Sequence, residues 1–473
     1  QIAQVALWLV DHQMNLRVSV EFGLYFARIP LISSPGIRHD NALRLDWNDV
    51  LPAERCSYVL GNPPFLGYSY QSKIQKADLS AVMHGIHGAG VLDFVCGWYI
   101  LAARYLQATH SRAAFVSTNS ITQGEHVALL WGEMQRLGMH IHFAHRTFQW
   151  SNEAKGNAAV HCVIIGFGND DQAVKTIYEY EDIKGLPLAV PAKNINPYLI
   201  DAPTVFLPKR REPICNVPQM SKGSQPTDGG NLLMSDGEKS SLLALEPQAA
   251  RWIRRFLGAD EFINNISRWC LWLVDCPPNE LRGMPEVMKR VHAVKAMRKA
   301  STKLPTIQLS ETSSIFGDIR QPEGGNYLLI PLHSSEYRAY VPIGFCDASI
   351  VCGNANAMIP NAGLLHFGIM TSAMHNAFMR FTCGRLESRF RYSNTIVYNN
   401  YPWPGFAGET LSDKHRTAIE HTAQCVLDAR AQFTDSSLAD LYDPLTMPPV
   451  LLKAHQKLDT AVDAAYRPSG GKK

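Results

Sequence analysis

Short apolar runs alternate with helical patterns over the first third of the chain. The runs that have the length and composition of strands lie at 56–60, 113–118, 141–144 and 160–167. Helical spacing of apolar residues extends over 1–15, 93–103 and 126–137. We expect the first strand to be buried. Strands that alternate with helices predict a parallel, doubly wound α/β sheet, which binds its ligands at the carboxyl ends of its strands.

Polar side chains follow the predicted strands at the points where these end. Asn62 and Asn119 each come within two residues of the end of an apolar run. Asn41 lies at the end of a further short strand, which we predict at 37–43. Phe148, in the loop predicted between the last two strands, offers an aromatic face. Because the carboxyl ends of parallel strands share one edge of a sheet, we expect these side chains to form one site.

The pattern changes after residue 168, where proline and glycine become frequent. Short β segments alternate there with helical patterns, which is typical of an α+β domain. The β segments are expected at 327–331 and 340–343, and the helices at 249–257, 289–303 and 364–381. Two more helical patterns follow a proline-rich stop near residue 404. We therefore predict an α/β domain over 1–168, an α+β domain over 169–404 and a C-terminal helical segment over 405–473.

Composition narrows the class of protein. With 473 residues, of which 46% are hydrophobic and 18% charged, the chain forms several globular domains and is not of the disordered class. The formal net charge is only +3, so a nucleic-acid surface requires local clustering of cations. The helix predicted at 289–303 supplies six lysines and arginines without an acid. A polyanion surface is the favoured interpretation of this helix, and a solvated face is the alternative.

Three further expectations come from the cysteines, from the targeting and membrane segments that were sought, and from the chain's first residue. The ten cysteines are dispersed without a C-x-x-C pair, which argues against a zinc cluster or a disulfide scaffold. We recognise no signal peptide and no apolar run long enough to cross a bilayer, so a cytoplasmic protein without a membrane partner is expected. The chain begins at Gln1 inside a helical pattern, which we interpret as a fragment of a longer protein.

One turn has a pattern with a specific chemistry, the segment Asn62-Pro63-Pro64-Phe65. The exocyclic amine of a nucleobase is a poor nucleophile because its lone pair is delocalised into the ring. The Asn62 carboxamide oxygen and the Pro63 carbonyl are two acceptors for both amine hydrogens, and this directs the lone pair at an electrophilic methyl group. Two prolines stiffen the turn and donate no N–H, and Phe65 supplies a flat face. A plain proline-rich turn is the structural alternative.

These residues resemble a known family. The segment Asn62-Pro63-Pro64-Phe65 is similar to the catalytic motif of gamma-type N6-adenine DNA methyltransferases. Nearly the whole chain resembles the methyltransferase and target-recognition portion of the MmeI-like (type IIL) restriction–modification enzymes. The other stretches that carry the resemblance are IAQVALWL at 2–9, FVSTNSI at 115–121, HRTF at 145–148, RYSN at 391–394 and YNNYPWP at 398–404.

The resemblance implies a reaction and a role for individual residues. The reaction is transfer of a methyl group from S-adenosylmethionine to N6 of an adenine flipped out of double-stranded DNA, without a metal. Asn62 and Pro63 would hold the adenine amine, while Phe65 and Phe148 would stack on the base. Asn41 would lie near the adenine of the cofactor. The fold implied is a Rossmann-like S-adenosylmethionine-dependent methyltransferase sheet followed by a DNA target-recognition domain.

The chain departs from the family pattern in one respect. The glycine-rich loop for the cofactor, the acidic residue for its ribose and the first two strands of the sheet would lie before Gln1. A nuclease module would lie farther upstream, and cleavage cannot be inferred from these residues. We therefore expect that this chain alone neither binds S-adenosylmethionine tightly nor methylates.

Two other functions remain open on the sequence alone. Turns of this type also serve methyltransferases of RNA, free bases or protein glutamine, although a large basic second domain favours DNA. A DNA-binding module without activity is the non-enzymatic alternative, and Asn62 argues against it. For sequence recognition we expect arginine to contact guanine, and the alternative is phosphate contact or surface ion pairing. The candidate DNA-binding residues are Arg298, Lys299, Glu336, Arg338, Arg385 and Arg389.

Overall fold

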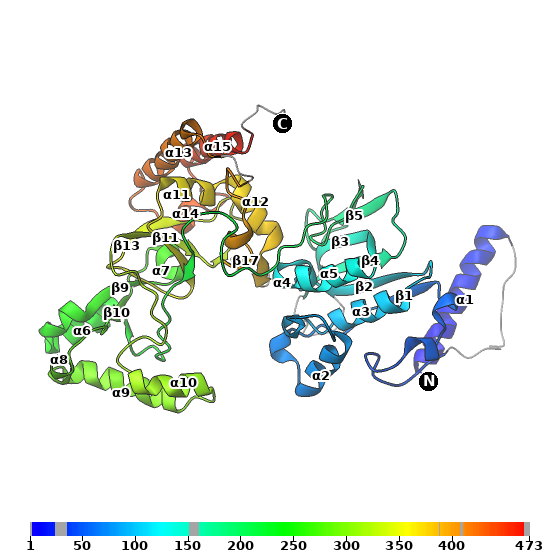
Figure 1. Cartoon of the computed structure of the whole chain (residues 1–473), viewed down its shortest axis with the longest axis horizontal. Coiled ribbons are helices and arrows are strands. Elements are labelled where there is room, and N and C mark those ends of the chain that lie inside the picture. The colour runs from blue at the N-terminus through cyan, green and yellow to red at the C-terminus, as the bar shows by residue number, and fades with distance from the viewer. Residues whose placement is uncertain (1, 24–35, 151–159, 387, 407–409, 468–473) are drawn as a thin grey trace. The chain divides into compact units, whose positions relative to one another are not determined.

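The computed structural model describes residues 2–23, 36–150, 160–386, 388–406 and 410–467, and it divides into two compact units (Figure 1). The N-terminal unit comprises Gln1–Thr122 and His126–Phe206. The C-terminal unit comprises Gln123–Glu125 and Leu207–Lys473.

A six-stranded sheet of order β1-β2-β4-β3-β5-β6 forms the centre of the N-terminal unit. Its strands are β1 (Tyr58–Gly61), β2 (Arg112–Thr118), β3 (His140–Trp150), β4 (Val160–Gly168), β5 (Lys175–Glu179) and β6 (Leu188–Ala192). The helices are α1 (Ile2–Phe22), α2 (Lys73–Val82), α3 (Cys96–Tyr105), α4 (Gly124–His126) and α5 (Gly132–Arg136), with a π-helical turn at Val127–Trp131 between the last two.

The sheet confirms the α/β class but is mixed, so the prediction of a wholly parallel sheet is wrong. β1 with β2 and β3 with β5 are parallel, whereas β2 with β4, β3 with β4 and β5 with β6 are antiparallel. The helix α3 connects the parallel pair β1 and β2 as a crossover. No helix of the described chain separates β3 from β4, and strands without a crossover between them pair antiparallel. The residues 145–150, predicted as a loop, continue β3.

An aromatic cluster around Tyr99 of α3 packs α3 against this sheet. The fully buried Tyr99 stacks on Phe167 of β4, with ring centroids 5.4 Å apart, and meets the ring edges of Phe115 and Trp131. Its hydroxyl lies 2.8 Å from Ser117 Oγ, so its one polar group is paired. Each buried aromatic ring removes a large apolar area from water, and together they fix α3 on β2 and β4.

The segments on either side of the outermost strand differ from their predictions. β1 is an edge strand whose Tyr58 and Leu60 side chains are 68% and 75% exposed, so the expectation of a buried strand is wrong. The strand predicted at 37–43 is also wrong, because Asn41 opens a turn in which its carbonyl accepts from the Arg44 N–H at 2.9 Å. Within the described chain no strand pairs with this segment, and a lone strand leaves its backbone groups unsatisfied.

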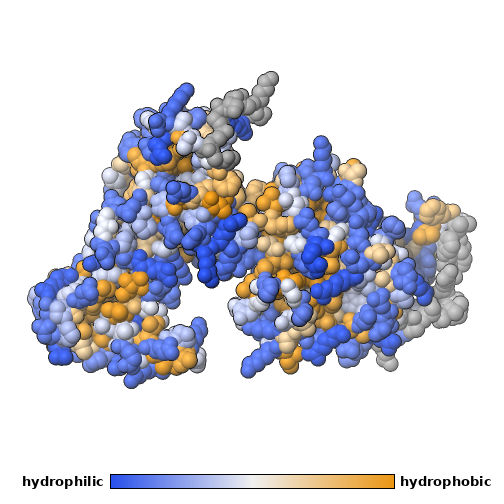
Figure 2. All heavy atoms as spheres, viewed as in Figure 1, coloured by the Kyte–Doolittle hydropathy of each residue, from blue (hydrophilic) through white to orange (hydrophobic). Residues whose placement is uncertain are grey.

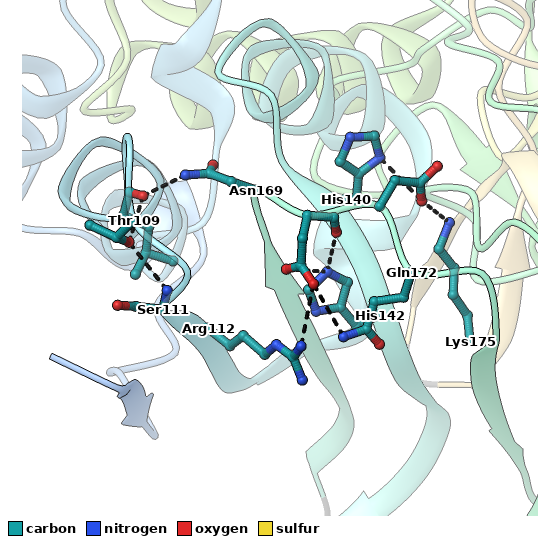
Figure 3. A network of polar contacts seen from close by, with 11 residues as sticks. Thr109, Ser111, Arg112, His140, His142, Asn169, Gln172 and Lys175 are labelled. Carbon is teal, nitrogen blue, oxygen red and sulfur yellow. Dashed lines mark hydrogen bonds and ion pairs between the residues drawn. The ribbon is translucent and has the colours of Figure 1, made fainter. Parts of the chain in front are cut away.

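The amino ends of β2, β3 and β5 are tied together by a polar network (Figure 3). In the turn after β4, Asp170 lies 3.3 Å from the Arg112 guanidinium, and its carbonyl is 2.7 Å from His142 Nε2. Asp171 accepts a 2.6 Å hydrogen bond from the buried Lys175 ammonium. This edge is held by charge pairs, whereas the opposite edge bears the polar strand ends.

Replacement of Asp171 by asparagine is expected to lower the free energy of unfolding by about 1 kcal/mol at neutral pH, a surface-pair value because this side chain is 61% exposed. The hydrogen bond from Lys175 lowers the pKa of Asp171. The wild-type contribution is therefore present above the unfolded pKa and is lost as pH falls through the folded one, so the variants should converge below about pH 4. Urea denaturation at several pH values measures this. Glu181→Gln, at an exposed acid, should change nothing.

The described part of the C-terminal unit forms three small sheets, of order β14-β9-β10-β8, β13-β11-β15-β7 and β12-β17-β16. Its strands are β7 (Ser221–Lys222), β8 (Leu233–Met234), β9 (Ile253–Leu257), β10 (Trp269–Leu271), β11 (Asn326–Pro331), β12 (His333–Ser334), β13 (Gly344–Asp347), β14 (Val351–Cys352), β15 (Asn356–Pro360), β16 (Gly384–Leu386) and β17 (Arg389–Arg391). Its helices are α6 (Asp236–Leu245), α7 (Ala259–Asn264), α8 (Pro278–Arg282), α9 (Pro285–Lys299), α10 (Leu304–Gln308), α11 (Leu364–Thr371), α12 (Ala373–Thr382), α13 (Asp413–Ala431), α14 (Leu438–Leu441) and α15 (Pro449–Ala465).

The C-terminal helices share a core with the α+β part of this unit. Buried residues of β11 and β15 pack in one cluster with residues of α11, α13 and α15. Gly368 of α11 permits this contact, because a Cβ there would lie 2.8 Å from the Ile419 side chain of α13. The helices predicted for 405–473 are present, and they belong to the same compact unit as the preceding residues.

One boundary and two elements differ from their predictions. β5 and β6 extend the first sheet beyond residue 168, where the sequence placed the end of the first domain. The helix predicted at 249–257 is a 3₁₀ turn followed by β9, and the β segment predicted at 340–343 is irregular. A short apolar run does not distinguish a strand from a helical turn, because it contains too few residues to show the spacing of either element.

No helix of the described chain is long and apolar enough to cross a membrane. On the face shown in Figure 2, apolar residues form separate patches among polar ones in both units. All ten cysteines are free thiols.

Candidate functional site

Four strands of the N-terminal sheet end at the same edge. β1, β2, β3 and β5 run in one direction, because β1 is parallel to β2, β4 is antiparallel to both β2 and β3, and β3 is parallel to β5. Asn62 follows β1, Asn119 follows β2, Phe148 lies near the end of β3, and Tyr180 follows β5. The structure therefore brings Asn62, Asn119 and Phe148 to one edge of the sheet, and that they act as a single site stays a prediction.

The strand register places Phe148 in line with the tip of β2. Cys162 of β4 is the pairing partner of Thr118 on one side and of Phe148 on the other. Strands lie about 4.8 Å apart, so about 14 Å separates the backbones of β1 and β3. That width accommodates a planar ring between side chains of the two strands. Burial raises the pKa of the Cys162 thiol to about 11, so the surface between them carries no charge from this thiol at neutral pH.

The turn Asn62–Phe65, here called the Asn62 turn, presents its first residue to solvent. Asn62 is exposed, whereas Pro63 is buried beneath it. Among the described residues the Asn62 carboxamide has no hydrogen-bond partner, which keeps both its oxygen and its amide available to a ligand. Gly61 permits close approach of the turn to the sheet, because a Cβ there would lie 3.3 Å from the Phe115 ring.

Two buried polar residues anchor the end of the Asn62 turn. The Leu66 N–H donates to Asp93 Oδ1 at 3.0 Å, and the Leu66 carbonyl accepts from Gln71 Nε2 at 2.9 Å. Asp93 also accepts from the Val95 N–H and the Thr118 hydroxyl. The Asp93 carboxylate thus joins the Asn62 turn to the tip of β2 and fixes the position of the exposed asparagine.

Asp93 and Gln71 support the site but were not among the residues predicted from the sequence. A signal for Asp93 existed, because an aspartate ahead of a helical pattern is typical of a helix start that binds backbone N–H groups. Gln71 had no such signal, since its partners, the carbonyls of Leu66 and Leu92, come together only in the folded chain.

Asn41 follows no strand of the described sheet, and its side chain is bonded to α2 and to its own turn. Its Nδ2 donates to Asp78 of α2 at 2.8 Å, and its Oδ1 accepts from the Leu43 N–H at 3.0 Å. Leu43 packs against Gly97 in the first turn of α3, which follows Asp93. Both groups of the Asn41 amide are therefore occupied by protein partners.

Among the candidate DNA-binding residues, the structure contradicts the prediction for Arg298. The structure buries this side chain completely, in α9, where its guanidinium donates to five backbone carbonyls. The acceptors are the carbonyls of Pro226, Thr227, Leu309, Thr312 and Ile315, at 2.8 to 3.0 Å. Arg298 therefore holds the C-terminal unit together and is not available to a polyanion.

The other candidates remain accessible in part. Lys299 and Arg389 are exposed, and Glu336 is half-buried. The Arg385 guanidinium lies 4.4 Å from the centroid of the Phe390 ring and donates to the Ser388 carbonyl. Burial lowers the pKa of Arg338, whose half-buried side chain lies in an irregular segment. These four arginine and lysine positions come from α9, β16, β17 and one loop, all within the C-terminal unit.

Sequence profiles of three domains match this chain. They are the MmeI DNA-methyltransferase domain at residues 1–179, the MmeI target recognition domain at 201–405 and the MmeI C-terminal domain at 411–473. DNA methyltransferase A of Bacillus subtilis (strain 168) is 36% identical over 470 residues, which is 98% of this chain and 52% of the relative.

A solved structure is also similar over the whole chain. It is that of the Type IIL restriction–modification enzyme MmeI in complex with DNA, with 53% sequence identity and a TM-score of 0.90. The match covers 100% of this chain and 62% of that one. The chain thus spans between one half and two thirds of the length of these two relatives.

Proposed function

This chain belongs to the MmeI family, and from that premise we propose that it is the base-binding and sequence-recognition portion of a DNA methyltransferase in a restriction–modification enzyme. The proposed reaction is transfer of a methyl group from S-adenosylmethionine to N6 of an adenine flipped out of a specific DNA sequence. The observation that carries it is the Asn62 turn, with an exposed, unpartnered carboxamide, at the edge where β1, β2 and β3 end.

In this proposal the chain's residues hold the acceptor base. The Asn62 carboxamide oxygen and the Pro63 carbonyl accept the two hydrogens of the adenine amine, which keeps its lone pair out of conjugation and aimed at the donor. Asp93 keeps this turn in place through Leu66. Phe65 and Phe148 stack on the flipped ring and offset the cost of unstacking it from the duplex, a few kcal/mol.

S-adenosylmethionine supplies an electrophilic methyl group when it is bound. The described residues do not make a complete cradle for it, because both groups of the Asn41 amide are already bonded to Asp78 and Leu43. Among the described residues, β1 also has a neighbouring strand on one side only. We therefore propose that further residues of the complete protein contribute to the cofactor site, and that this chain alone neither binds the cofactor tightly nor methylates.

The C-terminal unit is proposed to read the DNA sequence. MmeI, which this chain resembles over its full length, has been solved in complex with DNA. The accessible cations Lys299, Arg385 and Arg389 are the residues we propose for DNA contact, together with Glu336 and Arg338. A protein-glutamine methyltransferase has no need of such a domain, so the DNA reaction is favoured over that alternative.

The test is a measurement of N6-methyladenine by mass spectrometry in DNA of a host that expresses the complete gene product. We expect methyladenine above the level of a host with an empty vector, at a single sequence context. Absence of methyladenine would reject adenine methylation and leave RNA, protein or a binding function. Calorimetry on the chain of residues 1–473 tests the cofactor proposal, which micromolar binding of S-adenosylmethionine would overturn.

A further inference from the structure

Four aromatic rings gather where β3 and β5 end at the site. Tyr178 of β5 pairs with His145 of β3, and their rings stack with centroids 4.1 Å apart and planes inclined by 5°. The Tyr180 hydroxyl lies 2.9 Å from His145 Nδ1. The ring of Phe148 stacks on that of Tyr180, with centroids 5.4 Å apart and an interplanar angle of 22°. We call Tyr178, His145, Tyr180 and Phe148 the aromatic clamp.

A β-bulge brings two members of the clamp to the same face of the sheet. His145 pairs with Ile164 and Phe148 pairs with Cys162, so three steps along β3 match two steps along β4. In a regular strand, residues three apart point to opposite faces. The extra residue reverses this, and both rings then meet Tyr180. Bulges of this kind often redirect a side chain next to an active site.

Each contact of the clamp limits the motion of the next ring. The stacking on Tyr178 fixes the plane of His145, and burial lowers the pKa of His145, so a neutral ring faces the Tyr180 hydroxyl at pH 7. The hydrogen bond then fixes Tyr180, whose ring covers one face of Phe148. The orientation of the Phe148 ring, on which a base would stack, is therefore set by Tyr180.

We propose that Tyr180 and His145 are positioning residues, which hold the Phe148 ring in the orientation that receives the flipped adenine. The inference rests on the proposed function, in which Phe148 stacks on the target base. Neither residue touches the base, and they act through Phe148. A ring that is set before the base arrives loses no orientational freedom when the base stacks on it, and this accelerates the step that depends on it.

The test uses the complete gene product and a DNA duplex in which 2-aminopurine replaces the target adenine. The position of the target adenine comes from sequencing the modified host DNA. Tyr180→Ala should reduce the single-turnover methylation rate, measured on the duplex with adenine, by about ten- to a hundredfold. The rate of the 2-aminopurine fluorescence change, which reports base flipping, should fall by a similar factor. The concentration of DNA for half-maximal rate should change less than about twofold. Tyr180→Phe, which keeps the ring and removes the hydroxyl, should lower the rate less, by about threefold.

Two matched variants separate positioning from folding. Tyr58→Phe, at an exposed tyrosine outside the clamp at the start of β1, removes a hydroxyl for which the described residues offer no hydrogen bond, and it should leave the rate unchanged. The double variant Tyr180→Ala with Phe148→Ala should be no slower than Phe148→Ala alone, because Tyr180 acts through that ring.

Additive losses in the double variant, or a wild-type rate for Tyr180→Ala beside a slow Phe148→Ala, would overturn the positioning role. A wild-type rate for Phe148→Ala itself would remove the base-stacking role on which the proposal rests. No methylation by the wild-type protein would reject the proposed function instead.

Discussion

Replacement of Asn62 by alanine is expected to reduce the rate of methyl transfer at least a hundredfold. The carboxamide oxygen is one of two proposed acceptors for the amine hydrogens, and it is aimed at charge that develops as the nitrogen attacks. Loss of one such preorganised group typically costs 10²–10³ in rate, about 2.7–4 kcal/mol. Single-turnover transfer of labelled methyl groups to DNA by the complete gene product measures the loss.

The same substitution should leave the fold intact, because the Asn62 side chain is exposed and has no partner among the described residues. We expect a change in the free energy of unfolding within about 0.5 kcal/mol. Affinity for DNA should also persist, since the candidate contacts lie in the C-terminal unit. Asn279→Ala, at another exposed asparagine, is the matched control and should retain the full rate. A rate within tenfold of wild type for Asn62→Ala would reject the proposed role.

Local patterns predicted the Asn62 turn but not the surroundings that hold it. The turn is recognisable because its chemistry lies in four consecutive residues, and an apolar run places it after a strand. Asp93 and Gln71 bind this turn from 27 and 5 residues away, through backbone groups that have no sequence signature. The candidate residues were therefore predictable, whereas the contacts that position them were not.

The direction of each strand was equally beyond local reasoning. The sequence indicates strands at 141–144 and 160–167, but whether they pair in parallel depends on the connection between them. The bulge in β3 is also invisible in the pattern, although it decides that His145 and Phe148 share a face. Edge position explains why β1 differs from its prediction, because an apolar run is buried only when neighbours cover it.

Arg298 shows how the same residue type can serve opposite purposes. In the sequence it is one of six cations in a basic helical pattern, next to Lys299. Its five acceptors lie 11 to 17 residues later and 71 to 72 residues earlier, so nothing near it signals burial. Charge clustering predicts a surface only when the cations face solvent, and for Arg298 that condition fails.

Replacement of Arg298 by alanine is accordingly expected to destabilise the C-terminal unit by about 3–5 kcal/mol. Truncation removes all five hydrogen bonds and leaves buried carbonyl groups without donors, which costs more than the loss of the bonds themselves. For a unit of this size, the midpoint of thermal unfolding should fall by about 10 °C. Tryptophan fluorescence reports the loss, because Trp252, Trp269 and Trp272 pack in the core that includes residues of α9.

The adjacent Lys299→Ala provides a control that also discriminates the two interpretations of this helix. Lys299 is exposed, so its removal should shift the midpoint by less than about 2 °C while it lowers the salt dependence of DNA binding. Arg298→Lys should be destabilised almost as much as Arg298→Ala, because a single ammonium cannot reach five carbonyls that the planar guanidinium spans. If instead Arg298→Lys melts with the wild type and loses affinity for DNA, the side chain contacts phosphate, and the structural role is rejected.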